Sequence, residues 1–329
     1  MDGLLIVDKP AGWTSHDVVA RARRILKEKR VGHTGTLDPF ATGVLVLLVG
    51  RATRLAQFLA GAEKEYEATV RFGYATDTGD LTGARRESAS AAGGIDVDAP
   101  VQDCATLGRA RVESALARLR GEIEQVPPMY SAKKVGGKKL YELARRGEVV
   151  ERSAARVRVE VFEIVNGEGD NFLTRNDDGT CDARARVVCS AGTYVRALAE
   201  SLGELLGTGA HLAALRRTRA GQFRAGVAVT PDELQSLVEG KGLVEGGGAR
   251  EILIPLEAAL PDLPSAHLNA EESRRARHGA AVRALDPAES FEEGAHVLMF
   301  DERGSLVAVG VYDAARALLQ PRVMLAVEK

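Results

Sequence analysis

Asp38 is the residue whose sequence neighbours best suit a catalytic side chain. It lies in the segment GTLDP, after a loop rich in glycine and threonine and before the apolar run of residues 44–49. Pro39 favours an extended backbone at Asp38 and has no N–H to compete for the carboxylate. A carboxylate projected from such a loop fits a nucleophile or a general base. The alternative is a turn aspartate that bonds its own backbone, and an isolated Asp-Pro pair favours that alternative.

Tyr194 and Arg196 form a second candidate group, in the segment SAGTYVRALAE. The pattern predicts that both lie at the start of a helix. An arginine there could pair with a carboxylate and keep it ionised and oriented. The competing interpretation is a surface arginine on the helix and a tyrosine in the core.

A third group combines tyrosines with a run of lysines in PPMYSAKKVGGKKLYELARRG. Between residues 129 and 156, eight basic residues stand against three acidic ones, a local balance of +5. Basic side chains interleaved with tyrosines suit contact with an RNA backbone and stacking on its bases. A solvated, flexible lysine-rich loop is the competing interpretation. The lysines of the segment are Lys133, Lys134, Lys138 and Lys139.

The composition is that of an ordinary globular protein, with 329 residues, 45% hydrophobic and 27% charged, and a net charge of −2. No apolar run approaches the roughly 18 residues of a membrane helix, and the acidic N-terminal segment does not resemble a secretory signal. We therefore expect a cytoplasmic protein that does not bind a membrane. Because the net charge is slightly negative, any affinity for RNA must come from local basic patches.

The cysteines Cys104, Cys181 and Cys189 form no C-x-x-C pair, and the six histidines show no ligand spacing. These patterns argue against a disulfide framework and against a structural zinc site. The sequence thus predicts isolated thiols in a reducing compartment and no bound metal.

The hydrophobic pattern predicts strands and helices in mixed order. Thr14 and Asp17 have the spacing of a capping box at the start of an amphipathic helix, which follows a strand at residues 4–7. Further strands are predicted at residues 44–49, 65–74, 157–161 and 183–187, and further helices at residues 52–61, 112–119 and 192–207. The last two strands are expected to be antiparallel neighbours. Such an order favours an α+β fold over a doubly wound one.

The segments between these elements also carry information. Residues 84–100 have the composition of a loop, and residues 166–182 form a polar insertion with five acidic side chains, which we expect to point away from RNA. Residues 239–265 resemble a linker. The short apolar segments HVLMF, SLVAVGVY and RVMLAV then predict a small β-rich domain at the C-terminus.

Six segments occur together in the order and approximate spacing of the TruB family of tRNA pseudouridine synthases, which this sequence resembles from Leu4 to about Thr230. They are LLIVDKPAGWTSHDVV, VGHTGTLDPFATGVL, EKEYEATVRFGYATDTGD, PPMYSAKKVGGKKLYELAR, SAGTYVRALAESLG and GAHLAALRRT. That family isomerises uridine to pseudouridine at position 55 in the T loop of tRNA. The resemblance implies a catalytic domain at residues 1–250, with a mixed, largely antiparallel central sheet flanked by helices and a thumb-like RNA-binding insertion at about residues 126–150. It also implies a PUA-like RNA-binding domain at residues 262–329.

The resemblance further implies roles for three residues. Asp38 matches the family's nucleophile, which labilises the N-glycosidic bond so that the base can rotate and rejoin through C5. Arg196 matches the arginine that keeps this carboxylate ionised. Tyr66 matches the tyrosine that packs on the target base and is the candidate for handling the C5 proton. No cofactor or metal is expected, because substrate and product are isomers and a carboxylate can supply the covalent step.

The remaining matches concern RNA binding. His33 resembles the histidine that supports the rearranged T loop when the uridine leaves the stack. Tyr194 and Leu215 match positions that line the uridine pocket, and the lysine-rich segment resembles a thumb that clamps phosphates. The expected partner is the T arm of tRNA. We expect a monomer with no obligate protein partner.

Two other functions compete with this one. A non-catalytic module that binds or folds tRNA would use the thumb and the C-terminal domain, but it would not need Asp38, Tyr66 and Arg196 together. A guide-RNA-dependent synthase, as found in archaea and eukaryotes, shares a core like GHTGTLDP. The presence of the thumb segment and the absence of a long basic tail weigh against that relative.

Overall fold

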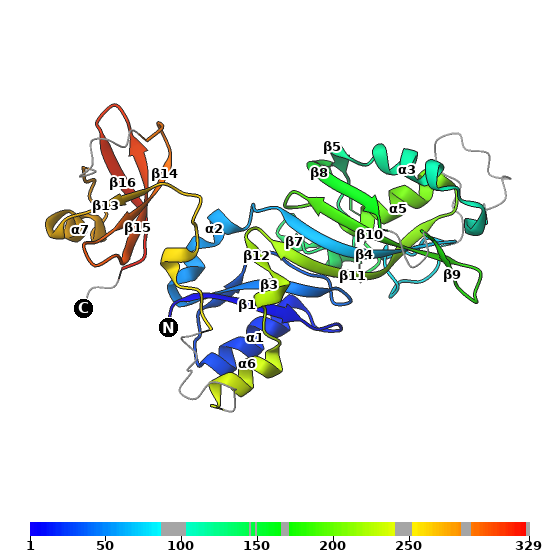
Figure 1. The fold of residues 1–329 in the computed structure, drawn as a ribbon, viewed down its shortest axis with the longest axis horizontal. Helices are drawn as coiled ribbons and strands as arrows, with labels where there is room; N and C mark the ends of the chain where they lie inside the picture. Colours follow the sequence, from blue (N-terminus) through cyan, green and yellow to red (C-terminus); the bar gives the residue numbers. More distant parts are fainter. Residues whose placement is uncertain are drawn as a thin grey trace.

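The structure, a computed structural model, describes residues 1–86, 103–144, 146–148, 150–165, 171–240, 252–283 and 291–326. Most of the predicted loop at residues 84–100, the start of the polar insertion and the middle of the predicted linker lie outside these ranges. A large central sheet and a small C-terminal sheet organise the chain (Figure 1). No helix within the described ranges is long and apolar enough to cross a membrane.

The central sheet has ten strands, and most of its neighbours are antiparallel. Its main strands follow in the order β1 (Gly3–Lys9), β3 (Thr42–Val49), β11 (Ala210–Ala220), β4 (Lys64–Phe72), β10 (Cys181–Cys189), β8 (Ala155–Ile164) and β5 (Gly121–Gln125). Three short strands pair alongside them: β2 (Val31–His33), β9 (Thr174–Arg175) and β12 (Phe223–Arg224). Among the strands that the structure describes in this sheet, only β3 and β11 pair in parallel. The predicted mixed, largely antiparallel α+β fold is confirmed, and so is the antiparallel pairing of β8 with β10.

Helices cover the sheet on both sides (Figure 1). Helix α1 (Ser15–Leu26) begins at the predicted capping box, in which Thr14 and Asp17 bond each other's backbone. It packs with α6 (Pro231–Val238) over one apolar side of β1 and β3. Helices α3 (Arg109–Ala117) and α5 (Val195–Leu206) cover β4, β8 and β10. The predicted helix at residues 52–61 divides into a 3-10 helix, η1 (Gly50–Leu55), and a short α2 (Ala56–Leu59).

Strand β11 holds the two halves of the central sheet together. It pairs with β3 on one side and with β4 on the other, so it is a central strand of the molecule. The hydrophobic pattern did not predict it, because three arginines in its second half hide any alternation and its pairing shifts register twice. A central position in a sheet depends on neighbours that are distant in the sequence, and local periodicity does not report them.

The small C-terminal sheet confirms the predicted β-rich end of the chain. It comprises β13 (Ser265–His267), β14 (His296–Phe300), β15 (Leu306–Asp313) and β16 (Leu318–Met324), with helix α7 (Ala270–Arg277) packed against it. One apolar cluster joins it to the central sheet, through β1, β3 and the 3-10 helix η5 (Leu256–Ala258). The guanidinium groups of Arg51 and Arg54 also bond backbone carbonyls at the end of β16.

The lysine-rich segment forms a small hairpin that precedes a short helix. Strands β6 (Lys134–Val135) and β7 (Lys138–Lys139) pair around Gly136 and Gly137, and helix α4 (Leu140–Ala144) follows. Both glycines have positive φ, at 56° and 84°, the geometry that tight two-residue hairpins require. The two glycines therefore shape a turn, with Lys134 and Lys138 exposed on either side of it.

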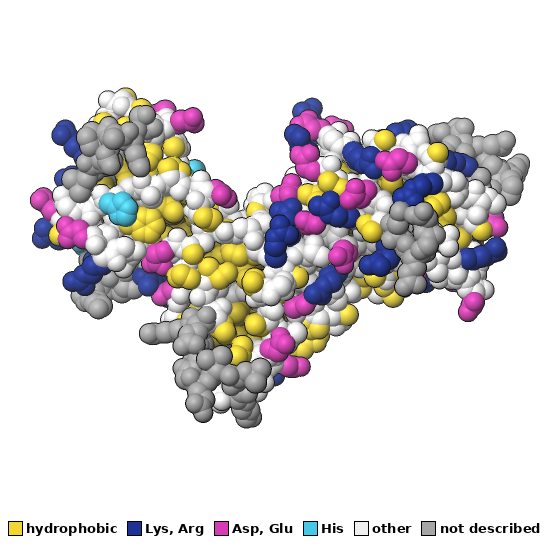
Figure 2. Space-filling view, viewed as in Figure 1, with side chains coloured by type: hydrophobic (Ala, Val, Ile, Leu, Met, Phe, Trp, Pro, Cys, Tyr) yellow, Lys and Arg dark blue, Asp and Glu magenta, His cyan; other side chains and the backbone are white. Residues whose placement is uncertain are grey.

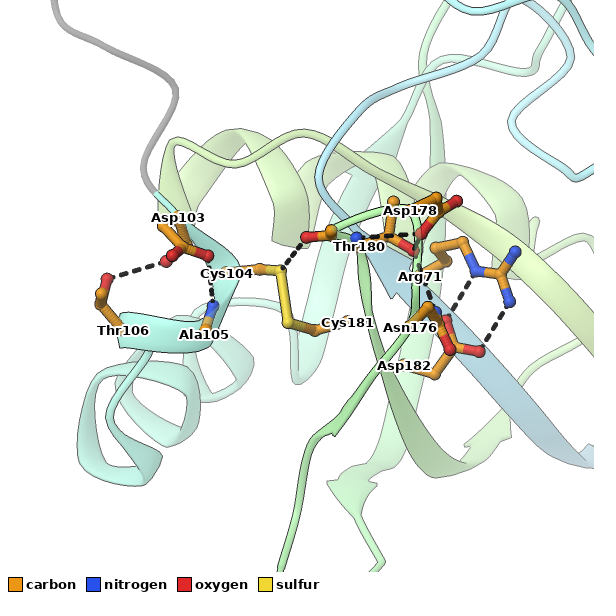
Figure 3. The surroundings of a disulfide bond; sticks show 11 residues. Arg71, Asp103, Cys104, Ala105, Thr106, Asn176, Asp178, Thr180, Cys181 and Asp182 are labelled. Carbon is orange, nitrogen blue, oxygen red and sulfur yellow. Dashed lines mark hydrogen bonds and ion pairs between the residues drawn. A yellow bond between two sulfur atoms is a disulfide. The ribbon is translucent and has the colours of Figure 1, made fainter.

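A disulfide joins Cys104 to Cys181 (Figure 3). The prediction of isolated thiols is wrong for these two residues, whereas Cys189 is a buried free cysteine. The two partners lie 77 residues apart in the sequence, at the 3-10 helix η2 (Cys104–Thr106) and at the start of β10. The fold brings their Cα atoms to 5.9 Å, a separation that the spacing of the cysteines could not reveal.

Candidate active site

A cavity of about 240 Å³ opens between the central sheet, the start of α5 and the segment before the lysine hairpin. Its walls come from the loop between β2 and β3, the end of α2, strand β4, the segment before the lysine hairpin, the loop before α5 with the start of that helix, and strand β11. Among the predicted site residues, five line it: Asp38, Tyr66, Tyr194, Arg196 and Leu215. The fold thus brings together side chains from positions 38 to 215 of the chain.

The loop that carries Asp38 is held by hydrogen bonds to the first residue of α1. The Ser15 hydroxyl accepts a hydrogen bond from the Leu37 backbone N–H at 2.8 Å and donates one to the Leu37 carbonyl at 3.2 Å. After Asp38, the Pro39 carbonyl accepts a bond from the Gly12 N–H at 2.8 Å. Because both neighbours of Asp38 are held by the chain's N-terminal segment, the carboxylate is presented from a rigid loop.

Lys9 provides a further anchor for this loop that the sequence analysis did not identify. Its side chain is completely buried, and its ammonium donates to the carbonyls of Trp13 at 2.6 Å and Pro39 at 3.2 Å. Burial lowers the pKa of Lys9 to about 8, and the negative charge of Asp38 opposes that change. Lys9 therefore ties the end of β1 to the residue that follows Asp38. Its sequence signal is the lysine before proline in VDKPAG.

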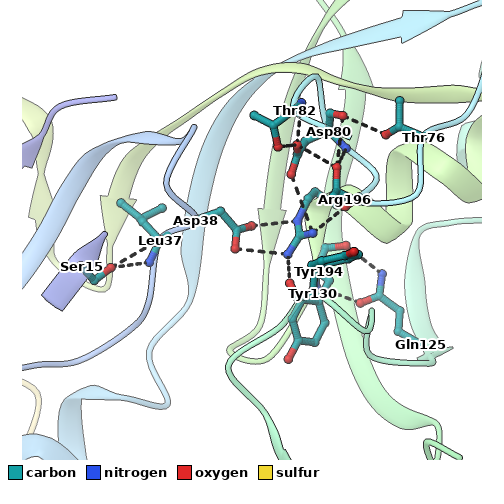
Figure 4. Close-up of polar contacts among 11 residues, drawn as sticks. Ser15, Leu37, Asp38, Thr76, Asp80, Thr82, Gln125, Tyr130, Tyr194 and Arg196 are labelled. Atoms are coloured by element: carbon teal, nitrogen blue, oxygen red, sulfur yellow. Dashed lines mark hydrogen bonds and ion pairs between the residues drawn. The ribbon is translucent and has the colours of Figure 1, made fainter. Parts of the chain in front are cut away.

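Asp38 and Arg196 form a bidentate ion pair (Figure 4). The Arg196 Nε donates to one carboxylate oxygen at 2.8 Å, and Nη2 donates to the other at 3.2 Å. The guanidinium is 4% exposed, whereas the Asp38 side chain is one-third exposed and faces the cavity. The arginine thus holds the carboxylate from its buried side and leaves it open to a ligand.

The other donors of Arg196 are also used. Nη1 donates to the Thr78 carbonyl at 2.6 Å, and Nη2 donates to the Tyr130 carbonyl at 2.7 Å. Tyr130 leads into the lysine hairpin, so the same guanidinium connects the carboxylate with the start of the thumb-like segment. Its orientation is over-determined by three separate parts of the chain, which is what a positioned active-site group requires.

Asp80 is a second carboxylate that the sequence analysis did not identify. It is 4% exposed, and its Oδ2 lies 3.8 Å from Arg196 Nη1, on the side away from Asp38 (Figure 4). Thr78 and Thr82 satisfy its other oxygen through their hydroxyls, at 3.0 Å and 2.5 Å. The signal was present in the segment TDTGDLTG, where threonines flank the aspartate on both sides at a spacing typical of an Asx turn.

The environment of Asp38 raises the pKa of its carboxyl group. Burial is the main cause, and the nearby negative charge of Asp80 acts in the same direction. Arg196 opposes both through its charge and its hydrogen bonds, and Lys9 adds a smaller opposing effect. The carboxylate is therefore kept reactive in a partly desolvated place because a fixed cation compensates for the lost water.

Tyr66 lies in the wall of the cavity on β4, opposite Arg217 of β11 and Val187 of β10. It is 8% exposed. Burial raises the pKa of its phenol, and the guanidinium of Arg217 works against that rise. Leu215, two residues before Arg217 on the same strand, adds an apolar surface to the cavity. Tyr194 is the N-cap residue of α5, and its backbone is held by the Gln125 amide at 2.9 Å and 3.3 Å.

The other predicted residues lie outside the cavity wall. His33 ends β2 next to the lining residues, and its Nδ1 accepts a bond from the Gly35 N–H at 3.3 Å. Burial lowers the pKa of His33, with a further contribution from Arg217. Lys133, Lys134 and Lys138 are exposed on the hairpin, and the side chain of Lys139 lies outside the described part of the structure. One face of the molecule shows basic and acidic side chains intermixed, without a uniformly basic surface (Figure 2).

This arrangement defines the class of protein. An oriented carboxylate, an aromatic side chain and an apolar residue surround a small cavity at a mixed sheet. Such a cavity is typical of an enzyme active site, with a nucleophile or base beside surfaces that suit a planar ring. The family model "TruB family pseudouridylate synthase (N terminal domain)" matches residues 23–195, and "tRNA pseudouridylate synthase B C-terminal domain" matches residues 196–261. The chain belongs to the TruB family of pseudouridine synthases, which are isomerases.

Similar proteins agree with this assignment. The chain is 41% identical to tRNA pseudouridine synthase B of Geobacillus thermodenitrificans over 98% of both proteins. It is 46% identical to tRNA pseudouridine synthase B of Thermobifida fusca, over 85% of this chain and 86% of that protein. Among solved structures, a Cbf5-Nop10-Gar1 complex contains a chain that is 28% identical, with a TM-score of 0.67 over 99% of this chain and 84% of that one.

Proposed function

We propose that the protein converts uridine to pseudouridine at position 55 in the T loop of tRNA, with Asp38 as the nucleophile. The observation that carries the proposal is the bidentate bond between Asp38 and the buried Arg196, at the wall of a cavity that Tyr66 and Leu215 also line. The names of the similar proteins, tRNA pseudouridine synthase B, support tRNA as the substrate.

The reaction needs only groups that the site contains. A uridine inside a stacked T loop must flip out to reach the cavity, where Tyr66 and Leu215, on neighbouring strands, offer aromatic and apolar surface for a planar base. Attack by the Asp38 carboxylate labilises the N-glycosidic bond, because Arg196 keeps the carboxylate ionised and fixes both of its oxygens. The detached base rotates, and its C5 bonds to C1′ of the ribose. The new bond releases the Asp38 carboxylate. Loss of the C5 proton and uptake of one proton at N1 then give pseudouridine, an isomer of the starting uridine.

Charges outside the cavity support the choice of RNA. The exposed lysines of the hairpin follow Tyr130 directly, and the Tyr130 carbonyl is bonded to Arg196. Phosphates held by Lys133, Lys134 and Lys138 would thus lie close to the target nucleotide. We further propose that the enzyme acts as a monomer, in the cytoplasm, without a cofactor and without an obligate protein partner.

A guide-dependent function is the second candidate, because the similar solved structures include an H/ACA RNP bound to a substrate RNA, in which a chain is 25% identical with a TM-score of 0.68. The higher identity to the tRNA pseudouridine synthase B proteins, 41% and 46%, favours stand-alone action.

The test is to incubate the purified protein with an unmodified tRNA transcript and to map pseudouridine. We expect one new pseudouridine, in the T loop, without any added RNA or protein. Asp38→Asn should reduce its formation by at least about 10⁴-fold, because the nucleophile is lost. Asp182→Asn, which changes a carboxylate bonded to Arg71 away from the cavity, is the matched control and should retain activity. Activity that persists in Asp38→Asn would exclude Asp38 as the nucleophile.

A further inference from the structure

Arg217 is a buried arginine in the cavity wall to which the mechanism above gives no role. It is 2% exposed and lies on β11, opposite Tyr66 of β4 and beside Gly43 of β3. Its Nε donates to the Val44 carbonyl at 2.6 Å, and its Nη2 donates to the Gly35 carbonyl at 3.0 Å. Removing a guanidinium from water is unfavourable, so its burial indicates that the contacts it makes are important.

The positions of these two carbonyls are informative. Gly35 comes before Asp38 in the loop, and Val44 comes after it, so one planar guanidinium fixes both ends of the segment that presents the nucleophile. The backbone packing is equally close, since a Cβ atom at Gly43 would lie 2.2 Å from the Arg217 carbonyl oxygen. The Asp38 loop and strand β11 are therefore held in one fixed arrangement.

The charge of Arg217 lies next to Tyr66, its partner across the pair of strands β11 and β4. Within the described part of the chain, Arg217 forms no ion pair with a carboxylate, and its hydrogen bonds to Val44 and Gly35 end on neutral carbonyls. Its positive charge and a hydrogen bond to the phenol both favour the ionised form of Tyr66. Burial is the largest effect and favours the neutral phenol, and so do Cys189 of β10 and Asp38. Two further cations line the cavity: Arg196, which is paired with Asp38, and Lys64, whose ammonium bonds the carbonyls of Ala60 and Ala62.

We propose that Arg217 is a positioning residue for the isomerisation. It fixes the position of the Asp38 loop relative to the Tyr66 phenol, and its charge lowers the free energy needed to form the phenolate that removes the C5 proton. This proposal rests on the function proposed above. After the bond between C5 and C1′ has formed, the C5 proton passes to the Tyr66 oxygen. The electron pair of the C5–H bond restores the double bond between C5 and C6, and the electron pair of the C6=N1 bond moves to N1, which takes up a proton from water. The tyrosine later returns its own proton to water.

The experiment compares Arg217→Met, Arg217→Lys and Tyr66→Phe with the wild type and with the double variant Tyr66→Phe/Arg217→Met. Release of the C5 hydrogen is followed in single turnovers from tRNA labelled at uridine C5, between about pH 6 and about pH 11, so that the range includes the ionisation of a phenol. Parallel reactions with deuterium at C5 give the isotope effect. Binding of tRNA and thermal melting report whether each variant folds.

We expect Arg217→Met to slow C5 hydrogen release by about 10²-fold while tRNA binding is retained. Its rate should keep rising with pH where the wild-type rate levels off, because its phenol ionises at higher pH. Its isotope effect should exceed that of the wild type, since proton removal becomes rate-limiting. Arg217→Lys should recover about tenfold, since the charge returns without the planar fork. When Arg217→Met is added to Tyr66→Phe, the rate of C5 hydrogen release should fall by less than about threefold further.

The opposite results would overturn the proposal. If the losses from Tyr66→Phe and Arg217→Met multiply, and if neither the pH profile nor the isotope effect changes, Arg217 acts only on the fold. If Arg217→Met does not fold, the pH profile of Arg217→Lys decides in the same way. Wild-type protein that makes no pseudouridine would refute the proposed function and this inference with it, whereas an active wild type with independent losses refutes the inference alone.

Discussion

The cavity and the lysine hairpin both carry positive charge, but it is buried in the cavity and exposed to solvent on the hairpin. In the cavity, Arg196 and Arg217 are at most 4% exposed, and their guanidinium groups bond carboxylate or carbonyl oxygens. On the hairpin, Lys133, Lys134 and Lys138 are exposed to solvent. Burial of a charge is unfavourable unless fixed partners surround it, and in the cavity those partners come from segments that are distant in the sequence. An exposed charge needs no such partners, and salt screens its effects.

The comparison teaches where each kind of function resides. Chemistry requires a carboxylate whose ionisation and direction are fixed, and only a desolvated, multiply bonded cation provides both. Attraction of a polyanion requires only accessible positive charge. We therefore expect changes in the cavity to affect the rate of the chemical step and changes on the hairpin to affect RNA affinity.

The largest effect should come from Arg196→Met. It removes the bidentate partner of Asp38 and leaves two carboxylates, the partly exposed Asp38 and the buried Asp80, without the cation that both contact. We expect the single-turnover rate to fall by about 10³-fold, with a smaller change in tRNA affinity. The control is Arg71→Met, which breaks an ion pair with Asp182 beside the disulfide. A loss of less than about tenfold in Arg196→Met would mean that the ion pair does not support catalysis.

The pH dependence of the rate provides a finer test of the cavity. Because burial raises the pKa of Asp38, the rate should fall on acidification at a higher pH than for an ordinary carboxyl group. Asp80→Asn removes a negative charge that contributes to that rise, so the acidic limb should move to lower pH. The rate at pH 8 should also fall, by about tenfold, since Arg196 loses a neighbour that helps to orient it. An acidic limb that stays in place in Asp80→Asn would contradict the proposed coupling.

A moderate effect, confined to binding, is expected on the hairpin. Replacing Lys133, Lys134 and Lys138 by glutamine should weaken tRNA binding and reduce the dependence of log K on log salt by roughly 2 to 3, with the saturated rate unchanged. The matched control replaces three exposed arginines at α3 and β9 by glutamine: Arg109, Arg118 and Arg175. Equal losses in both triple variants would show that the hairpin has no special role in RNA binding.

The smallest effect on activity is expected at the disulfide. Replacing both Cys104 and Cys181 by serine opens a covalent loop between residues 77 positions apart, and the chain-entropy model puts the loss in free energy of unfolding at about 4 to 5 kcal/mol. Thermal melting should show this loss, and reduction of the wild type should reproduce it. Activity should change by less than about twofold, since neither cysteine lines the cavity. A large loss of activity at a temperature where the variant is folded would show that the two regions are coupled.

Much of the fold and of the site was predictable because the signals were local. The capping box at Thr14, the apolar run before Gly50 and the alternation in β8 and β10 depend on neighbours in the sequence, and the structure confirms them. The motif positions Asp38, Tyr66 and Arg196 were likewise readable from their sequence context. The roles of these three residues, of His33 and of the lysines stay predictions until the variants are measured.

Tertiary structure alone decided the contacts between distant segments. The local signals at Lys9 and Asp80 indicate turns, and Arg217 has none, so none of the three is separated by its sequence from surface charges in loops, yet the fold buries all three around the cavity. The pairing of Cys104 with Cys181 and the central place of β11 are of the same kind. The physical reason is that periodicity and capping record how a residue relates to its own turn or strand. Burial of charge depends on which strands become neighbours in the sheet, and only the assembled fold fixes that.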